Sequence, residues 1–145
     1  MQVKFKKVPE ALRNEIEDLI FFSAETHGIA DNDFVLRVEV EKLEDNTYGE
    51  IAEHDLDSNI VILRIGKNVQ AEKTRKFLHK LVIHEMTHVK QFIKDGLAIW
   101  ADGEVAFRGM SYSMKNSADY WLAPWEVEAR GYEDGIYTLW REQAG

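Results

Sequence analysis

One segment, His84-Glu85-x-x-His88, constrains this chain of 145 residues more than any other. It lies inside residues 74–94, which have the pattern of one amphipathic helix. The stripe of that helix consists of Phe77, Leu81, His84, His88 and Phe92, at spacings of three and four. Side chains four apart on a helix lie one turn above each other on the same face, so both imidazoles can reach one point. We therefore predict a helix that presents two histidines to a shared partner.

A divalent cation suits this pair of histidines best. Two neighbouring imidazoles in an apolar stripe need polar partners, and a cation bound by both satisfies them together. Zinc fits this role, and Glu85, one residue round the helix, can reach a water on the open side of the metal. The alternative is a pair of histidines that only make hydrogen bonds in the core, with Glu85 solvated. We interpret the remaining histidines as structural: His27, His54 and His79.

Composition narrows the classes of function that this chain can serve. Asp plus Glu number 26 against 18 Lys plus Arg, and the net charge of −8 opposes binding to nucleic acid or to an anionic membrane. Because the chain has no cysteine, a metal must be held by histidine and carboxylate groups. Residues 9–28 carry charges where a signal peptide needs an apolar run. We therefore expect a cytoplasmic protein with a single domain over residues 1–145.

The order of predicted elements indicates an α+β fold. Apolar stripes with Pro and Gly boundaries predict three long helices, and short apolar or alternating runs predict strands between them. The predicted helices cover residues 9–27, 74–94 and 124–141, and the predicted strands cover residues 3–5, 34–43, 48–53 and 59–65. Asp102-Gly103 predicts a hairpin within residues 97–107, and residues 108–119 are expected to form an irregular wall or lid. We expect a small, twisted, mostly antiparallel sheet packed against these helices.

A catalytic zinc needs a third protein ligand, which must come from elsewhere in the chain. Glu126 and Glu128, near the start of the last predicted helix, are the candidates. They flank the apolar stripe of that helix, which comprises Trp125, Ala129, Tyr132, Ile136, Leu139 and Trp140. Side chains two positions apart on a helix point nearly oppositely, so only one of the two carboxylates can face a given metal. Periodicity alone does not choose between them.

The arrangement His84-Glu85-x-x-His88, followed by Glu126-x-x-Ala129 in a downstream helix, resembles the gluzincin metallopeptidases. The order of elements is also similar to the minimal zincin core, of which small stand-alone versions occur in bacteria and phages. The resemblance implies that His84, His88 and Glu126 bind zinc. It also implies that Glu128 supports the site or is solvated.

The chain departs from the family pattern at Arg130. Many members carry a carboxylate or an amide there, four residues after the liganding glutamate, and it orients a zinc histidine. We expect Asp119 or Glu133 to supply that support instead. The strand predicted at residues 59–65 resembles the zincin edge strand that pairs with an extended peptide, which implies recognition through the main chain.

The resemblance implies a peptidase mechanism with Glu85 as the catalytic base. A zinc-bound water would attack the peptide carbonyl while Glu85 takes its proton and later protonates the leaving amine. The candidates for a donor to the developing oxyanion are Tyr112, Tyr120 and Tyr132. Two alternatives stay open: a metal-dependent hydrolase of non-peptide amides, and a non-catalytic interaction protein that zinc stabilises. The expected partner is a peptide or protein substrate, and no oligomeric state is indicated.

Overall fold

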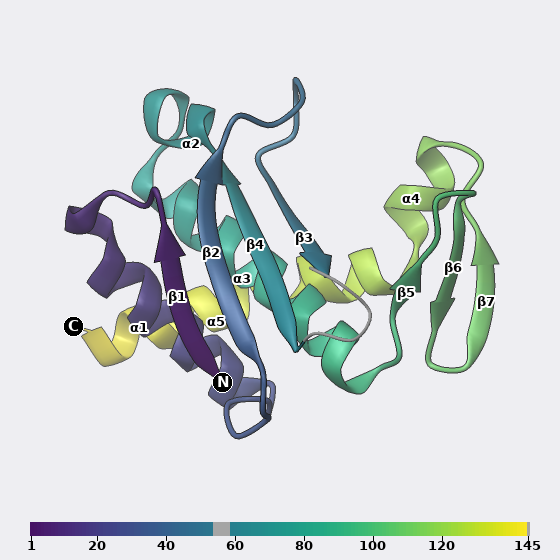
Figure 1. The fold of residues 1–145 in the computed structure, drawn as a ribbon, viewed down its shortest axis with the longest axis horizontal. Helices are drawn as coiled ribbons and strands as arrows, with labels where there is room; N and C mark the ends of the chain where they lie inside the picture. Colours follow the sequence, from purple (N-terminus) through teal and green to yellow (C-terminus); the bar gives the residue numbers. More distant parts are fainter. Residues whose placement is uncertain (54–58, 145) are drawn as a thin grey trace.

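The computed structural model describes residues 1–53 and 59–144, and it has the expected α+β architecture (Figure 1). Its main sheet has four strands in the order β1 (Gln2–Lys6), β2 (Val35–Glu41), β4 (Ile60–Gly66) and β3 (Gly49–Glu53). Three long helices lie behind this sheet: α1 (Glu10–Thr26), α3 (Arg75–Lys94) and α5 (Pro124–Ala144). The short helix α2 (Lys67–Glu72) precedes α3. The sheet is therefore covered by helices on the face that is distant in Figure 1.

The strands of the main sheet do not pair as the sequence led us to expect. β1 pairs with β2 and β2 pairs with β4 in parallel, and only β3 runs antiparallel to its neighbour β4. The mostly antiparallel sheet was therefore a wrong prediction for these four strands. The crossover through α1 returns the chain to the same end of the sheet before β2 begins, so β1 and β2 run parallel. β3 then takes the outer position and pairs antiparallel with β4, which leaves β4 parallel to β2.

The edge strand beside α3 is β3, and β4 lies in the interior of the sheet. Our expectation that residues 59–65 form the edge was therefore wrong. The apolar run of β4 explains its position, because Val61, Ile62 and Leu63 are all buried. β3 carries polar residues and offers its outer backbone groups to solvent or to a partner strand.

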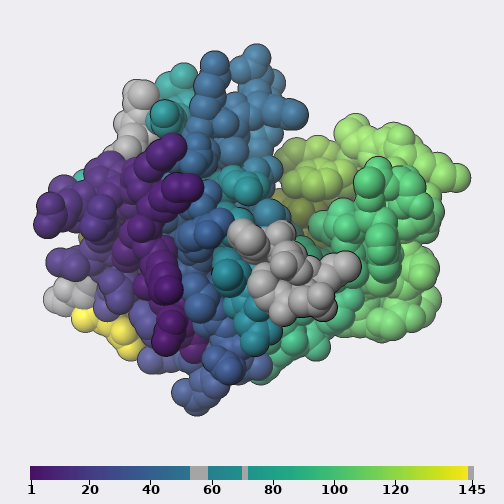
Figure 2. Space-filling model, viewed as in Figure 1, coloured from purple at the N-terminus to yellow at the C-terminus, as the bar shows by residue number. Residues whose placement is uncertain are grey.

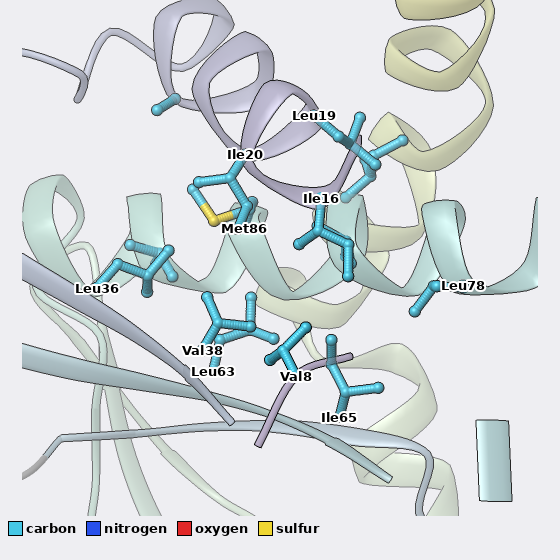
Figure 3. Packing of buried hydrophobic residues seen from close by; sticks show 14 of the residues in the cluster. Val8, Ile16, Leu19, Ile20, Leu36, Val38, Leu63, Ile65, Leu78 and Met86 are labelled. Carbon is cyan, nitrogen blue, oxygen red and sulfur yellow. The ribbon is translucent and has the colours of Figure 1, made fainter. Parts of the chain in front are cut away.

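The main core lies between the sheet and the helices (Figure 3). Ile16, Leu19 and Ile20 of α1 belong to one cluster with Met86 of α3, and the inner face of the sheet closes the layer from below with Leu36, Val38, Leu63 and Ile65. The deeply buried face of α3 carries Leu78, Val82, Met86 and Val89. The predicted stripe through Phe77, Leu81 and His84 is instead half-buried, because it flanks the core and faces a cleft.

The start of α3 is fixed by a local signal. The Thr74 hydroxyl accepts a hydrogen bond from the backbone N–H of Phe77 at 3.1 Å, so Thr74 caps the helix. α5 runs to Ala144, three residues beyond its predicted end. Of its predicted stripe, Trp125, Ala129, Ile136 and Trp140 are buried. Tyr132 and Leu139 are 39% and 52% exposed and do not belong to the core.

A second, smaller sheet follows α3 and forms what we call the lobe, residues 97–123. It contains β5 (Ala98–Ile99), β6 (Glu104–Phe107), β7 (Met110–Ser113) and the short helix α4 (Ser117–Leu122). The predicted hairpin at Asp102-Gly103 joins β5 to β6. Residues 108–119 are more regular than expected, because a turn at Arg108-Gly109 leads into β7 and Asn116 caps α4. Figure 2 shows the lobe, in green, beside the rest of the molecule. No helix among the described residues is both long enough and apolar enough to cross a membrane.

Candidate metal centre

The two histidines of the motif face each other on consecutive turns of α3. Their Nε2 atoms lie 3.2 Å apart, and the rings meet edge to face at 4.8 Å between centroids. His88 is buried, and His84 is partly open to the cleft. The spacing of four residues on one helix therefore produces the predicted pair.

Glu126, in the first turn of α5, is the carboxylate that meets both histidines. Its Oε2 lies 3.2 Å from Nε2 of His84, and its Oε1 lies 3.1 Å from Nε2 of His88. Within the described residues, one potential ligand atom from each of these three side chains lies within 4.8 Å of the other two. Glu128, the alternative candidate, points away from them and binds Lys90, Gln91 and Arg108.

Each histidine also has a partner at its other ring nitrogen. Nδ1 of His84 lies 2.6 Å from Oε1 of Glu133, and Nδ1 of His88 lies 2.7 Å from Oε1 of Gln91. Glu133 was one of two residues expected for this role, and it lies two helical turns after Glu126. Asp119, the other, instead accepts a hydrogen bond from the backbone N–H of Lys115.

Sequence reasoning missed Gln91. The signal was available, because Gln91 follows His88 by three residues and therefore lies on the same face of α3. What the sequence could not show is that its side chain folds back onto His88 instead of reaching solvent. Gln91 is fully buried, so its amide must find all its partners within the protein.

Whether a cation fits between His84, His88 and Glu126 depends on which ring nitrogen of each histidine carries the proton. Because the partners of both Nδ1 atoms are oxygen acceptors, each Nδ1 carries a proton, and a neutral ring then has a lone pair at Nε2. The two Nε2 atoms therefore meet the Glu126 carboxylate as three acceptors with no proton between them. Oε2 of Glu126 is buried and has no hydrogen-bond partner within the described part of the chain. A divalent cation satisfies all three groups at once.

The alternative to a cation is a second proton on each histidine. Burial lowers the pKa of His84, but hydrogen bonds to Glu126 and Glu133 outweigh burial and raise that pKa to about 10. The pKa of His88 is raised in the same way, while the two histidines lower the pKa of Glu126 to about 2 against the effect of burial. Two imidazolium ions with nitrogens 3.2 Å apart would repel each other. One cation in place of two protons removes that repulsion, so the three residues fit a divalent cation.

Glu85 lies next to this cluster and is 6% exposed. Burial raises the pKa of its carboxyl group above the ordinary value, although both neighbouring histidines act in the opposite direction. A carboxylate with a raised pKa is a stronger base, which suits proton transfer near neutral pH. Glu85 also lines the cleft on both sides of the cluster.

Of the three tyrosines considered as donors, only Tyr120 lines the cleft beside Glu85 and Glu126. Burial raises the pKa of Tyr120 to about 12, and the negative charges of Glu126 and Glu85 add to the effect. Its hydroxyl therefore keeps its proton at neutral pH and can donate. Tyr112 packs against Trp125 and Tyr132 against His27, so neither reaches the cleft.

The cleft extends on two sides of the cluster. One side is a cavity of about 420 Å³ whose apolar walls include Tyr48, Phe77, Leu81 and Trp121. The other is a cavity of about 170 Å³ whose walls include Ile51, Phe92, Leu97 and Ile99. Five residues border both: Gly49, His84, Glu85, Tyr120 and Glu126. The candidate centre thus lies midway along a groove between β3 and the lobe.

The two other histidines within the described residues, His27 and His79, contact polar side chains elsewhere in the protein. Nε2 of His27 lies 3.2 Å from the hydroxyl of Thr87, and Nε2 of His79 lies 2.9 Å from Oε1 of Glu15. His79 also meets Trp140 edge to face. His54 lies outside the described residues.

Neither a protein-family model nor a curated protein nor a solved structure matches this chain. The resemblance to gluzincin metallopeptidases therefore rests on the two short motifs around His84 and Glu126. Function has to be inferred from the geometry of the cluster and of the groove that contains it.

Proposed function

We propose that this chain is a zinc-dependent metallopeptidase in which His84, His88 and Glu126 hold the metal. The observation that carries the proposal is the convergence of two Nε2 atoms and one carboxylate in a buried position. Their distances are 3.1 to 3.2 Å, and both Nδ1 atoms are already engaged as donors. Zinc bound there would act as a Lewis acid that polarises a carbonyl group and lowers the pKa of a water molecule.

Glu85 performs the proton transfers in this proposal. It accepts a proton from the water whose oxygen forms the new bond to the carbonyl carbon, and it then donates that proton to the nitrogen as the C–N bond breaks. Tyr120 donates a hydrogen bond to the oxygen that gains negative charge. The position of both residues beside Glu126 in the groove supports these roles.

The groove supports an extended peptide as the substrate. Because it continues on both sides of Glu85, a chain can pass through, which favours cleavage within a chain over removal of a terminal residue. β3 borders both cavities and is an edge strand, so its free backbone groups can pair with the substrate main chain. We expected residues 59–65 to form this edge strand, but in the structure β3 occupies the edge.

Two other functions would use the same cluster. A metal-dependent hydrolase of non-peptide amides would need the same base and metal but would accept small amides. A non-catalytic protein could use zinc only to clamp α3 to α5, since the three proposed ligands come from those two helices. The burial and raised pKa of Glu85 favour catalysis over a clamp, because a clamp has no use for them.

Substitution of the base tests the proposal. With zinc-loaded protein and a quenched-fluorescence peptide library blocked at both ends, we expect Glu85→Gln to lower kcat by about 10² to 10⁴-fold while zinc content stays at one ion per chain. Glu142→Gln, at the exposed end of α5, is the matched control and should cleave normally. An inactive wild-type protein with full zinc content would favour the clamp, and turnover of small amides alone would favour the amide hydrolase.

Zinc content also tests the ligands. Glu126→Ala should lose the metal after dialysis against a weak chelator, as measured by elemental analysis. Retention of zinc by this variant would contradict the assignment of Glu126. A cytoplasmic location belongs to the same proposal. It is compatible with a chain that has no cysteine and therefore no disulfide that requires an oxidising compartment, and fractionation of cells that express a tagged chain tests it.

A further inference from the structure

Glu128 has no place in the mechanism above, yet it is held by three side chains. Its Oε1 lies 2.8 Å from Nζ of Lys90 and 3.1 Å from Nε2 of Gln91. Its Oε2 lies 2.5 Å from a guanidinium nitrogen of Arg108, which belongs to the lobe. The Lys90 ammonium and the Arg108 guanidinium can only donate hydrogen bonds, so both oxygens of Glu128 act as acceptors.

The Gln91 amide can lie in only one orientation because of these neighbours. Its nitrogen donates to the backbone carbonyl of Trp125 at 2.9 Å and to Oε1 of Glu128 at 3.1 Å. Both partners are acceptors. If the amide were turned over, its oxygen would face two acceptors in a buried place, with no proton among the three atoms.

The orientation of the amide decides where His88 carries its proton. With the oxygen of Gln91 2.7 Å from Nδ1 of His88, Nδ1 must donate, and the lone pair lies on Nε2. A reversed amide would present its NH₂ group, so Nδ1 would have to accept. The proton would then sit on Nε2 and point at Glu126 and His84, where the metal belongs.

We propose that Glu128 is a positioning residue that keeps the lone pair of His88 directed at the metal, acting through the side-chain amide of Gln91. The inference rests on the proposed metal site and goes beyond its ligands. Trp125 contributes through a backbone carbonyl, so among the described residues Glu128 is the only side chain that holds the amide nitrogen. His84 needs no equivalent positioning residue, because its partner is the carboxylate of Glu133. Both oxygens of a carboxylate accept hydrogen bonds, so turning that group over leaves the proton on Nδ1 of His84.

The test compares zinc affinity in three variants of the full-length protein, measured by competition with a chromogenic chelator. Glu128→Ala removes the acceptor, and we expect its zinc affinity to fall by about tenfold. Gln91→Leu removes the partner of His88 itself and should lose at least as much. Glu128→Gln keeps an oxygen that can accept from Gln91, so its loss should stay below about threefold.

Arg108→Ala is the matched control. It removes a charged partner from Oε2 of Glu128 but leaves the contact between Oε1 and Gln91. We expect its thermal stability to fall while its zinc affinity stays within about twofold of the wild type. The Nδ1–H signal of His88, in ¹⁵N-labelled zinc-loaded protein, gives a second measure: its proton should exchange faster in Glu128→Ala and not in Arg108→Ala.

The outcomes separate this inference from the proposed function. Wild-type affinity and an unchanged Nδ1–H signal in Glu128→Ala would overturn the inference and leave the zinc site intact. Equal loss of affinity in Arg108→Ala and Glu128→Ala would also overturn it, because the network would then act only through stability. A wild-type protein that binds no zinc would refute the proposed function, and the inference with it.

Discussion

The main sheet with its helices and the lobe differ in how completely they bury their apolar residues. The first region encloses a large cluster that includes Leu36, Leu63, Ile83 and Met86, all fully buried. The lobe contributes only four residues to a small buried cluster, which Trp125 of α5 completes, and it leaves Ile99, Trp121 and Leu122 at 60%, 57% and 75% exposed. All three proposed ligands and both Nδ1 partners lie on α3 and α5, outside the lobe. The contrast suggests a rigid support for the chemistry and a less tightly packed wall for recognition.

Leucine-to-alanine substitutions that create a cavity in each region should reveal this difference in packing. Leu63→Ala, in the main core, should lower the free energy of unfolding by about 3 to 5 kcal/mol, because a fully enclosed site cannot collapse. Leu97→Ala, in the lobe beside the groove, should cost only about 2 kcal/mol, since solvent and neighbours can fill the space. Urea unfolding of both variants measures the two values.

Native-state hydrogen exchange checks the same contrast without substitution. Amides of β6 should exchange through openings of lower free energy than amides of β4. Equal protection in the two strands, together with equal losses in the two Leu→Ala variants, would remove the distinction between the regions.

The sequence predicted the local parts of the site and left the long-range parts open. The positions of His84, Glu85 and His88 follow from helix periodicity alone, which is why they were predictable. Glu126 and Glu128 could not be separated that way, because the choice depends on how α5 is rotated against α3. The burial of Trp125 and Ala129 on one side of α5 sets that rotation and turns Glu126 toward the histidines.

Sheet topology shows the same limit. Alternation and apolar runs located all four strands of the main sheet, but they carry no information on which strands pair. One clue was present, since a strand, a helix and a second strand in succession favour a parallel pair. β3 lies at the edge because the more apolar β4 is buried in the interior of the sheet. Which of the two strands takes the interior position can be decided only by comparing them within the folded sheet.

Acid should weaken the first region more than the lobe. Burial, followed by the positive charge of Lys90, lowers the pKa of His27 from 6.5 to about 4. Between those pH values the unfolded chain takes up a proton that the folded chain does not, so stability falls as pH falls, by up to about 3 kcal/mol. Above pH 6.5 this group contributes no pH dependence.

The charged groups that influence His27 are on α3 and α5 or directly after α3: Lys90, Lys94, Asp95 and Glu128. Urea unfolding of the wild type and of His27→Gln at several pH values measures the effect, and the variant should lose part of the acid sensitivity. The lobe contains no histidine, so protection of its amides should change less over the same range. A full acid response in His27→Gln would assign the loss to other groups.

The smallest expected effect concerns the lobe as the wall of the groove. Trp121 borders the wide cavity, and its ring carries the guanidinium of Arg130 at 4.9 Å. Trp121→Ala should raise KM for a peptide with a large apolar side chain by about tenfold, or about 1.4 kcal/mol, and leave kcat nearly unchanged. Leu122→Ala is the control, because Leu122 is still more exposed but borders neither side of the groove. A fall in kcat in Trp121→Ala with constant KM would mean that the lobe helps to build the chemistry, and the division of labour between the two regions would then be wrong.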